Sequence, residues 1–501
     1  MGRMMNIKQA KDEIKNTVQA YLKKDALGEY RIPAVRQRPI LLMGPPGIGK
    51  TQIMEQIARE CKIGLVSYTI THHTRQSAVG LPFIKEEEFE GNTYSVTEYT
   101  MSEIIASVYR KMRESSLKEG ILFLDEINCV SETLAPTMLQ FLQCKRFGNQ
   151  AVPEGWIIVA AGNPPEYNKS VRDFDVVTLD RVRRMDITAD FGVWKEYARE
   201  KHLHPAILSY LELRPNHFYK VEADVDGIQF VTARGWEDLS NLMETYEALG
   251  IPVGEEVIHE FLRHEDVAED VAAYFDLYRK YQDDYGITEI LKGNVKPQVY
   301  ARIYEAAFDE RLSVVNLLLD GLQQYWNVYE KQKQMTDAWY DFLKKYRSML
   351  VDGDNAAASY TKLLGEWQET FELEKKNEFL TKQDRIWKEE LSVKLKGAVP
   401  AADLADKETF AYVKQGFDTC TAQLEQVENE AGEALECAFT FMEQAFENGQ
   451  EMVIFVTQLT IGKESSHYLS EHICERYLKY NEELLIGTRK AELLAELGRE
   501  K

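Results

Sequence analysis

The residues best suited to chemistry form an eight-residue loop, 44–51, that fits the pattern G-x-x-x-x-G-K-[ST]. An apolar run at 40–43 precedes the loop and predicts a strand, and residues 52–60 predict a helix. In such a strand–loop–helix unit, backbone N–H groups surround the β-phosphate of a nucleotide and the N-terminus of the helix faces it. We therefore expect a nucleotide-binding site formed by Gly44, Pro45, Pro46, Gly47, Ile48, Gly49, Lys50, Thr51 and Gln52.

Two acids at the end of a second apolar run extend this site. The run 120–124 ends at Asp125 and Glu126. Because parallel strands present functional residues at their carboxyl ends, Asp125 is expected beside Thr51, and the two would bind Mg²⁺. Glu126 can take a proton from the attacking water or orient it. An Asp-Glu pair alone is typical of a solvated turn, but with Lys50 and Thr51 it predicts hydrolysis of a nucleoside triphosphate.

An amide and two arginines complete the candidate site. The apolar run 156–161 ends just before Asn163, which could bind the γ-phosphate or orient the water, or could lie in an Asn-Pro turn without a role. Arg181 and Arg234 each lie next to a predicted element, and arginine is suited to stabilise charge on a transferring phosphoryl group. The candidate catalytic residues are Lys50, Glu126, Asn163, Arg181 and Arg234.

Taken in order, these motifs resemble those of the MoxR-type AAA+ ATPases. The resemblance covers the region before residue 280 and rests on segments 44–51, 80–82, 124–128, 161–164, 179–181 and 232–239. It implies that Asp125 and Glu126 are the Walker B pair and that Asn163 is sensor 1. It also implies that Arg181 is the arginine finger, which completes a neighbouring subunit's site, and that Arg234 is sensor 2.

One position departs from the family pattern. The family usually has an aromatic residue after Leu-Asp-Arg, whereas here Val182 is followed by Arg183 and Arg184. Either arginine could be the finger in place of Arg181, or both could be ordinary surface charges.

The resemblance further implies an activity and partners. The protein would hydrolyse ATP with Mg²⁺ in a homo-oligomeric ring, as a rule a hexamer, and would remodel or mature a protein client as a chaperone does. Relatives are often paired with a von Willebrand factor A-domain protein. Two alternatives stay open. One is a nucleic-acid-acting ring that resembles replicative helicases or restriction GTPases, and the other is a scaffold that binds nucleotide but hardly turns it over.

The pattern along the chain divides it into three predicted domains. An α/β AAA+ P-loop core, with a parallel sheet between helices, is expected over 1–192, followed by an all-helical lid over 193–282. A mostly α-helical domain, 283–501, would dock a partner or clamp neighbouring subunits, and we favour docking. Within the core the pattern predicts a helix at 7–22, and within the lid a helix at 235–248. Hairpins are predicted around Gly91-Asn92 and over 145–152, as candidate contact loops or plain surface turns.

Composition excludes several classes of protein. A chain of 501 residues is too long for one core, so we expect about two to four domains. The net charge of −22 and the pI near 5.0 disfavour a protein that follows a nucleic-acid backbone. Six cysteines without a C-x-x-C pair favour neither a zinc site nor disulfides. The apolar stretch at 452–456 is far too short to span a membrane, and no signal peptide is visible, so we expect a cytoplasmic protein.

Overall fold

The computed structural model describes residues 4–72, 75–167, 171, 174–224, 227–351, 355–400 and 406–485. The chain divides into two compact units, which we treat separately. The first comprises Met1–Lys195, Phe218–Trp236 and Glu374–Leu380, and the second comprises Glu196–His217, Glu237–Leu373 and Thr381–Lys501.

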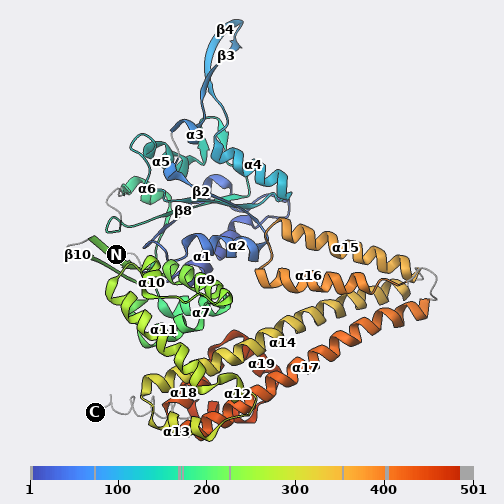
Figure 1. The fold of residues 1–501 in the computed structure, drawn as a ribbon. Helices are drawn as coiled ribbons and strands as arrows, with labels where there is room; N and C mark the ends of the chain where they lie inside the picture. The colour runs from blue at the N-terminus through green and yellow to red at the C-terminus, as the bar shows by residue number, and fades with distance from the viewer. Residues whose placement is uncertain are drawn as a thin grey trace, which may run out of the picture. The chain divides into compact units, whose positions relative to one another are not determined.

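The first unit is built on a parallel sheet of five strands in the order β2-β5-β8-β1-β9 (Figure 1). Its strands are β1 Ile40–Met43, β2 Gly64–Thr69, β5 Gly120–Asp125, β8 Trp156–Gly162 and β9 Arg183–Asp186. Ile40 and Leu42 pack on one side of the sheet, and Leu41 and Met43 pack on the other. Burial on both faces explains why the three central strands, β1, β5 and β8, are continuous apolar runs, whereas the edge strands β2 and β9 contain polar residues. The predicted α/β core with a parallel sheet is confirmed.

Helices cover both faces of this sheet. On one face lie α1 Ile7–Leu22 and α2 Lys50–Cys61, and on the other lie α4 Glu103–Ser115 and α5 Ala135–Cys144. The short helices α3 Arg75–Val79 and α6 Val176–Arg181 belong to the same unit, and α7 Phe191–Glu200 follows β9. The predicted helix at 7–22 has the expected bounds because Asn6 and Gln9 form a capping box at its start.

Two hairpins extend from the first unit, both where the sequence predicts them. The strands β3 Pro82–Phe89 and β4 Asn92–Tyr99 form the longer hairpin, which projects from the rest of the unit in Figure 1. The strands β6 Arg146–Phe147 and β7 Gln150–Ala151 form the shorter one. Gln150 joins them: its Oε1 accepts from the Ser102 N–H at 2.9 Å, and its Nε2 donates to the Tyr99 carbonyl at 3.1 Å.

A third hairpin lies in the first unit where the sequence analysis predicted only helices. Its strands are β10 Lys220–Asp224 and β11 Gly227–Val231, paired antiparallel. Helix α9, Ala233–Leu249, follows directly and contains the predicted helix at 235–248. The region expected to be a lid therefore carries a short β-hairpin as well as its helices.

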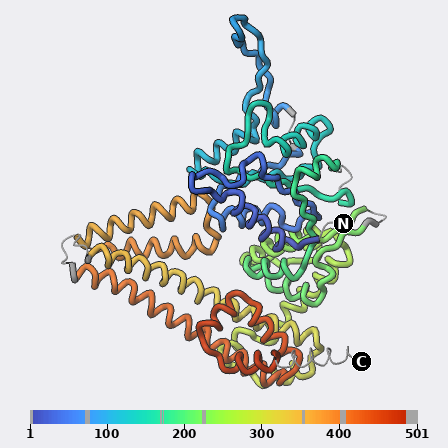
Figure 2. Tube along the Cα trace, turned by 180° about the vertical axis from the view of Figure 1, so that it is seen from behind, coloured from blue at the N-terminus to red at the C-terminus, as the bar shows by residue number. Residues whose placement is uncertain are grey.

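Among its described residues, the second unit contains helices and connecting loops but no extended strand. Its helices are α8 Pro205–Leu213, α10 Glu255–Phe261, α11 Glu265–Tyr285, α12 Ile287–Leu291, α13 Pro297–Glu305, α14 Phe308–Val351, α15 Ala356–Lys376, α16 Lys382–Gly397, α17 Asp406–Phe446, α18 Gln450–Ile461 and α19 Lys463–Glu471. The long helices α14 and α17 run side by side in both views (Figures 1 and 2). Trp339, Tyr346, Tyr360 and Trp387 belong to a core cluster that joins them with α15 and α16. In the described parts of the chain, no helix is long and apolar enough to cross a membrane.

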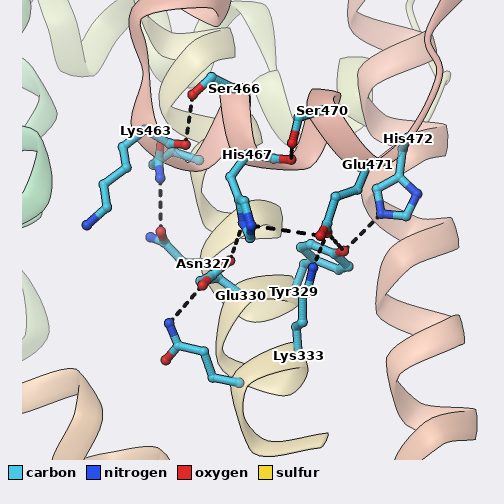
Figure 3. Close-up of polar contacts among 12 residues, drawn as sticks. Asn327, Tyr329, Glu330, Lys333, Lys463, Ser466, His467, Ser470, Glu471 and His472 are labelled. Atoms are coloured by element: carbon cyan, nitrogen blue, oxygen red, sulfur yellow. Dashed lines mark hydrogen bonds and ion pairs between the residues drawn. The ribbon is translucent and has the colours of Figure 1, made fainter. Parts of the chain in front are cut away.

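A polar network also ties α14 to α19 (Figure 3). Glu471 of α19 accepts a hydrogen bond from the Tyr329 hydroxyl at 2.9 Å and forms an ion pair with Lys333, both on α14. His467 Nδ1 lies 2.9 Å from Glu330 Oε2. The hydrogen bond with Lys333 holds the pKa of Glu471 below its usual value.

Candidate functional site

The loop 44–51 connects the carboxyl end of β1 to the first turn of α2, as the sequence predicts. Gly47 and Gly49 adopt positive φ angles of 73° and 92°. A Cβ atom on Gly47 would lie 3.0 Å from the side chain of Thr232, so no larger residue fits without a shift. The loop therefore depends on glycine both for its conformation and for its close contact with the segment before α9.

The carbonyl oxygens in the middle of the loop are hydrogen-bonded, whereas the adjacent N–H groups are not. The Tyr219 hydroxyl donates to the Pro46 carbonyl at 2.9 Å, and the Arg234 N–H donates to the Gly47 carbonyl at 3.2 Å. Among the described residues, no hydrogen bond uses the N–H of Gly47 or Ile48. The C=O and N–H of one peptide point in opposite directions. The N–H groups of Gly47 and Ile48 therefore point away from Tyr219 and Arg234, which contact the carbonyls of the same two peptides. Unpaired N–H groups in such a turn form an anion-binding nest.

Lys50 is buried at the centre of the site, with 8 % of its surface exposed. Its Nζ donates to the carbonyls of Gly44 and Pro45 at 2.7 and 2.8 Å and to Asn163 Oδ1 at 2.8 Å. Burial lowers the pKa of Lys50 to about 8, opposed by the negative charge of Asp125. The acceptors in direct contact with this buried ammonium group are neutral, so a bound phosphate would supply a counter-charge at hydrogen-bond distance.

The acids lie where the sequence predicts them, at the end of β5. Thr51 Oγ1 donates to Asp125 Oδ2 at 3.1 Å, so the hydroxyl and the carboxylate can share one hard cation. This donor set fits Mg²⁺. Glu126 has a φ angle of +56°, and its N–H donates to Asp125 Oδ1 at 2.9 Å. A positive φ is uncommon for a residue with a Cβ atom, and strain of this kind is often found at active sites.

Asn163 is held by a side chain to which the sequence assigns no role. Asn128 Nδ2 donates to the Asn163 carbonyl at 2.8 Å, and the Asn163 N–H donates to Asn128 Oδ1 at 3.3 Å. A Cβ atom on Gly162 would approach Asn128 Oδ1 to 2.5 Å, so the glycine leaves room for this pair. Asn128 thus sets the position of the amide that contacts Lys50. The sequence contains one indication of this role, because Asn128 belongs to the motif at 124–128.

The arginines fall into two groups. Arg234, at the start of α9, lies beside the loop: its Cβ would be 3.5 Å from a Cβ atom on Gly47, and its charge lowers the pKa of Lys50. Arg181, at the end of α6, is exposed and contacts Gln143 of α5. No contact among the described residues joins Arg181 to the loop.

The two alternative arginines are engaged elsewhere. Arg183 is paired with Glu13 at 2.5 Å and hydrogen-bonded to Thr17 at 2.6 Å, both on α1. Arg184 is paired with Asp186 of its own strand at 2.8 Å.

Comparison with known proteins agrees with this geometry. Residues 40–181 match the model of the family described as "ATPase family associated with various cellular activities (AAA)". The curated proteins contained no match. Among solved structures, the chain is similar to the crystal structure of a "putative ATPase" from Cytophaga hutchinsonii ATCC 33406, with 13 % identity, a TM-score of 0.24, and 64 % of this chain and 75 % of that chain covered. That TM-score is too low to support any inference. The family match spans the loop, both acids and Asn163, so residues 40–181 form an AAA-family ATPase domain and the protein is an ATPase.

Proposed function

We propose that the protein binds ATP with Mg²⁺ at the loop 44–51, hydrolyses it with Glu126 as the base, and acts as a ring that remodels a protein client. The observation that carries this proposal is the pair of unused N–H groups at Gly47 and Ile48, with Lys50 and Thr51 in the same loop and Asp125 hydrogen-bonded to Thr51. The N–H groups for an anion, the Lys50 ammonium group and the oxygens for a metal ion thus lie at one edge of the sheet. Parallel α/β sheets bind their ligands at this edge, at the carboxyl ends of the strands.

Each residue has a defined task in the proposed reaction. Thr51 and Asp125 would hold Mg²⁺, which neutralises charge on the β- and γ-phosphates. Glu126 accepts the proton of the water that attacks the γ-phosphorus. Lys50 and Asn163 bind the γ-phosphate oxygens, and Arg234 adds positive charge from α9.

Three observations support the ring and the client. Members of the AAA family are usually oligomeric. Arg181 is exposed and contacts a neutral side chain, Gln143, whereas Arg183 and Arg184 are paired with acids of their own subunit. Of these three arginines, Arg181 is therefore the best placed to reach a neighbour's phosphate. The exposed hairpin β3–β4 and the long helices after residue 283 offer surfaces for a client or for a MoxR-type partner such as a von Willebrand factor A-domain protein.

Glu126→Gln tests the catalytic assignment. The substitution removes a base but no metal ligand, so we expect ATP binding to be kept and turnover to fall by at least about a hundredfold. Lys50→Ala should instead lose nucleotide affinity. The matched control is Glu154→Gln, the same change at an exposed position before β8, which should hydrolyse ATP at the parental rate. Parental turnover in Glu126→Gln would show that another residue is the base.

The same preparations distinguish the two alternative functions. Stimulation of turnover by single- or double-stranded nucleic acid would favour a nucleic-acid-acting ring, although the net charge of −22 makes such stimulation unexpected. ATP binding and assembly without measurable turnover in the parental protein would favour a scaffold. A pull-down with Glu126→Gln in ATP would identify the client, because a trapped complex dissociates slowly.

A further inference from the structure

Tyr219 lies outside the part of the chain that matches the AAA family, 40–181, yet its hydroxyl contacts the phosphate loop. We propose that Tyr219 is a positioning residue for nucleotide binding: it holds the Pro46–Gly47 peptide in the orientation that points the Gly47 N–H at the phosphates. This inference rests on the proposed function, because it assumes that the loop 44–51 binds the nucleotide.

The hydroxyl of Tyr219 is well placed to donate. Its oxygen is 2.9 Å from the Pro46 carbonyl oxygen, and its ring packs against the core cluster that contains Ile48. Burial raises the pKa of Tyr219 above its usual value, and Tyr167 nearby raises it further. The hydroxyl therefore keeps its proton at neutral pH and can donate to the carbonyl.

Tyr219 holds a central carbonyl of the loop, that of Pro46, with a side-chain donor. Lys50 contacts the carbonyls of Gly44 and Pro45, but it must turn towards the phosphates when they arrive. The Gly47 carbonyl is held by the backbone N–H of Arg234, which a change of side chain does not remove. Among the contacts of the described residues, the Pro46 carbonyl is thus the one held by a side-chain donor to which we assign no other task in the reaction.

The hairpin β10–β11 brings these two contacts together. Tyr219 directly precedes β10, and Arg234 follows β11 by a short connection. Lys220 pairs with Val231, which closes the hairpin at its base and sets the two loop-holding residues side by side. The unpredicted hairpin, with the described residues that flank it (219–224 and 227–234), thus holds two successive peptides of the loop.

Tyr219→Phe tests the proposal, because it removes one oxygen and leaves the ring in place. We expect the dissociation constants of ATP and ADP to rise by the same factor, roughly threefold to tenfold, which is the range for one lost hydrogen bond. The two nucleotides should change alike because the loop N–H groups face the β-phosphate, which both contain. We expect kcat at saturating ATP to stay within about twofold, because no group of the reacting centre is removed.

The matched control is Tyr360→Phe. Tyr360 also donates from its hydroxyl to a backbone carbonyl, that of Leu395 at 2.7 Å, but it lies in the second unit. This variant should lose thermal stability to a similar extent and bind ATP and ADP as the parental protein does. Amide exchange at Gly47 and Ile48 in saturating ADP gives a second measurement, and we expect faster exchange in Tyr219→Phe than in either reference protein.

Three outcomes would overturn the inference: unchanged affinities in Tyr219→Phe, a fall in kcat with an unchanged KM, or failure of Tyr219→Phe to fold when Tyr360→Phe folds. The last result would make the hydroxyl a structural group instead of a positioning one. Failure of the proposed function looks different. In that case the parental protein itself would bind ATP independently of Lys50 or turn it over independently of Glu126.

Discussion

Lys50 combines two properties that make nucleotide binding depend on pH. Its pKa in the free protein is lowered to about 8 by burial, and bound phosphates favour its charged form and raise that pKa. Between the two values binding takes up a proton, so affinity is full below about pH 8 and falls as pH rises above it, by up to about tenfold per pH unit. Calorimetric titration of ADP at pH 7 and pH 9 measures the change.

Lys145 provides the control for this prediction. Burial also lowers the pKa of Lys145 to about 8, but its Nζ donates to the Ala34 carbonyl at 2.7 Å, and no hydrogen bond among the described residues joins it to the loop 44–51. Lys145→Gln should therefore keep the parental pH dependence of ADP affinity. If Lys145→Gln abolished that dependence, or if the parental affinity were the same at pH 7 and pH 9, the assignment to Lys50 would be wrong.

The sequence predicts the side chains that meet at this site but not those that hold its backbone. Lys50, Thr51, Asp125 and Asn163 converge because each follows a buried strand of one parallel sheet, a rule that apolar runs reveal. Tyr219 donates to the Pro46 carbonyl, and Asn128 binds the carbonyl and the N–H of Asn163. No pattern of residue types marks such a contact, since it depends on where two distant segments pass each other.

At the scale of elements, prediction succeeded where the local pattern and the tertiary environment agree. The buried strands, the helix at 7–22 and the two hairpins of the core are examples. The hairpin β10–β11 was missed although its signal is present: apolar residues alternate at Val221 and Ala223 and at Ile228 and Phe230, around Asp226-Gly227. Each strand has only five residues, and the sequence on both sides has helical periodicity. The helical pattern therefore dominates the short alternation when the sequence is considered alone.

The network between α14 and α19 in Figure 3 should stabilise the second unit measurably. Glu471→Gln removes the counter-charge of Lys333, whose side chain is 19 % exposed, and weakens the hydrogen bond from Tyr329. We expect a loss of about 1 kcal/mol in the free energy of unfolding, a low value because Glu471 is 35 % exposed and solvent screens it. Urea unfolding followed by circular dichroism gives this number.

The pH dependence of that contribution follows from the direction of the shift. The pKa of Glu471 lies below its ordinary value of 4.5, so the stabilisation is present above that value and is lost as pH falls through the folded-state pKa. The control is Asp418→Asn, which breaks an i,i+4 pair with Lys414 in which both side chains are more than half exposed. It should change stability by at most about 0.5 kcal/mol. Equal losses in both variants would mean that the network adds nothing beyond surface charge.

At the scale of the whole molecule, the proposed ring predicts complementation between inactive subunits. Arg181→Ala retains the loop and the acids but offers no finger, whereas Lys50→Ala offers a finger but binds nucleotide poorly. In a one-to-one random mixture, a site is complete when an Arg181→Ala subunit has a Lys50→Ala neighbour on the correct side. We expect about a quarter of the parental turnover per site if sites act independently.

The control variant for this experiment is Arg184→Ala, whose guanidinium pairs with Asp186 in the same strand and which should stay active alone. Exchange of subunits must be demonstrated with labelled protein. If subunits exchange and no mixture exceeds the sum of its components, Arg181 does not act on a neighbouring site, and Arg183 becomes the next residue to substitute.

Helix α14 is long enough that a small change in its direction would move its far end a long way. Its 44 residues span about 66 Å. Near its start it is held to α8 through the Asn316–Ser209 hydrogen bond of 2.9 Å and to α11 through Tyr278 and Asp320, 3.0 Å apart, and its far end packs with α16 and α17 (Figure 2). A rotation of about 10° at the held end carries the far end through about 11 Å, or roughly two helical turns. For a given change in the direction of α14, the displacement of its far end is therefore set by the length of this one helix.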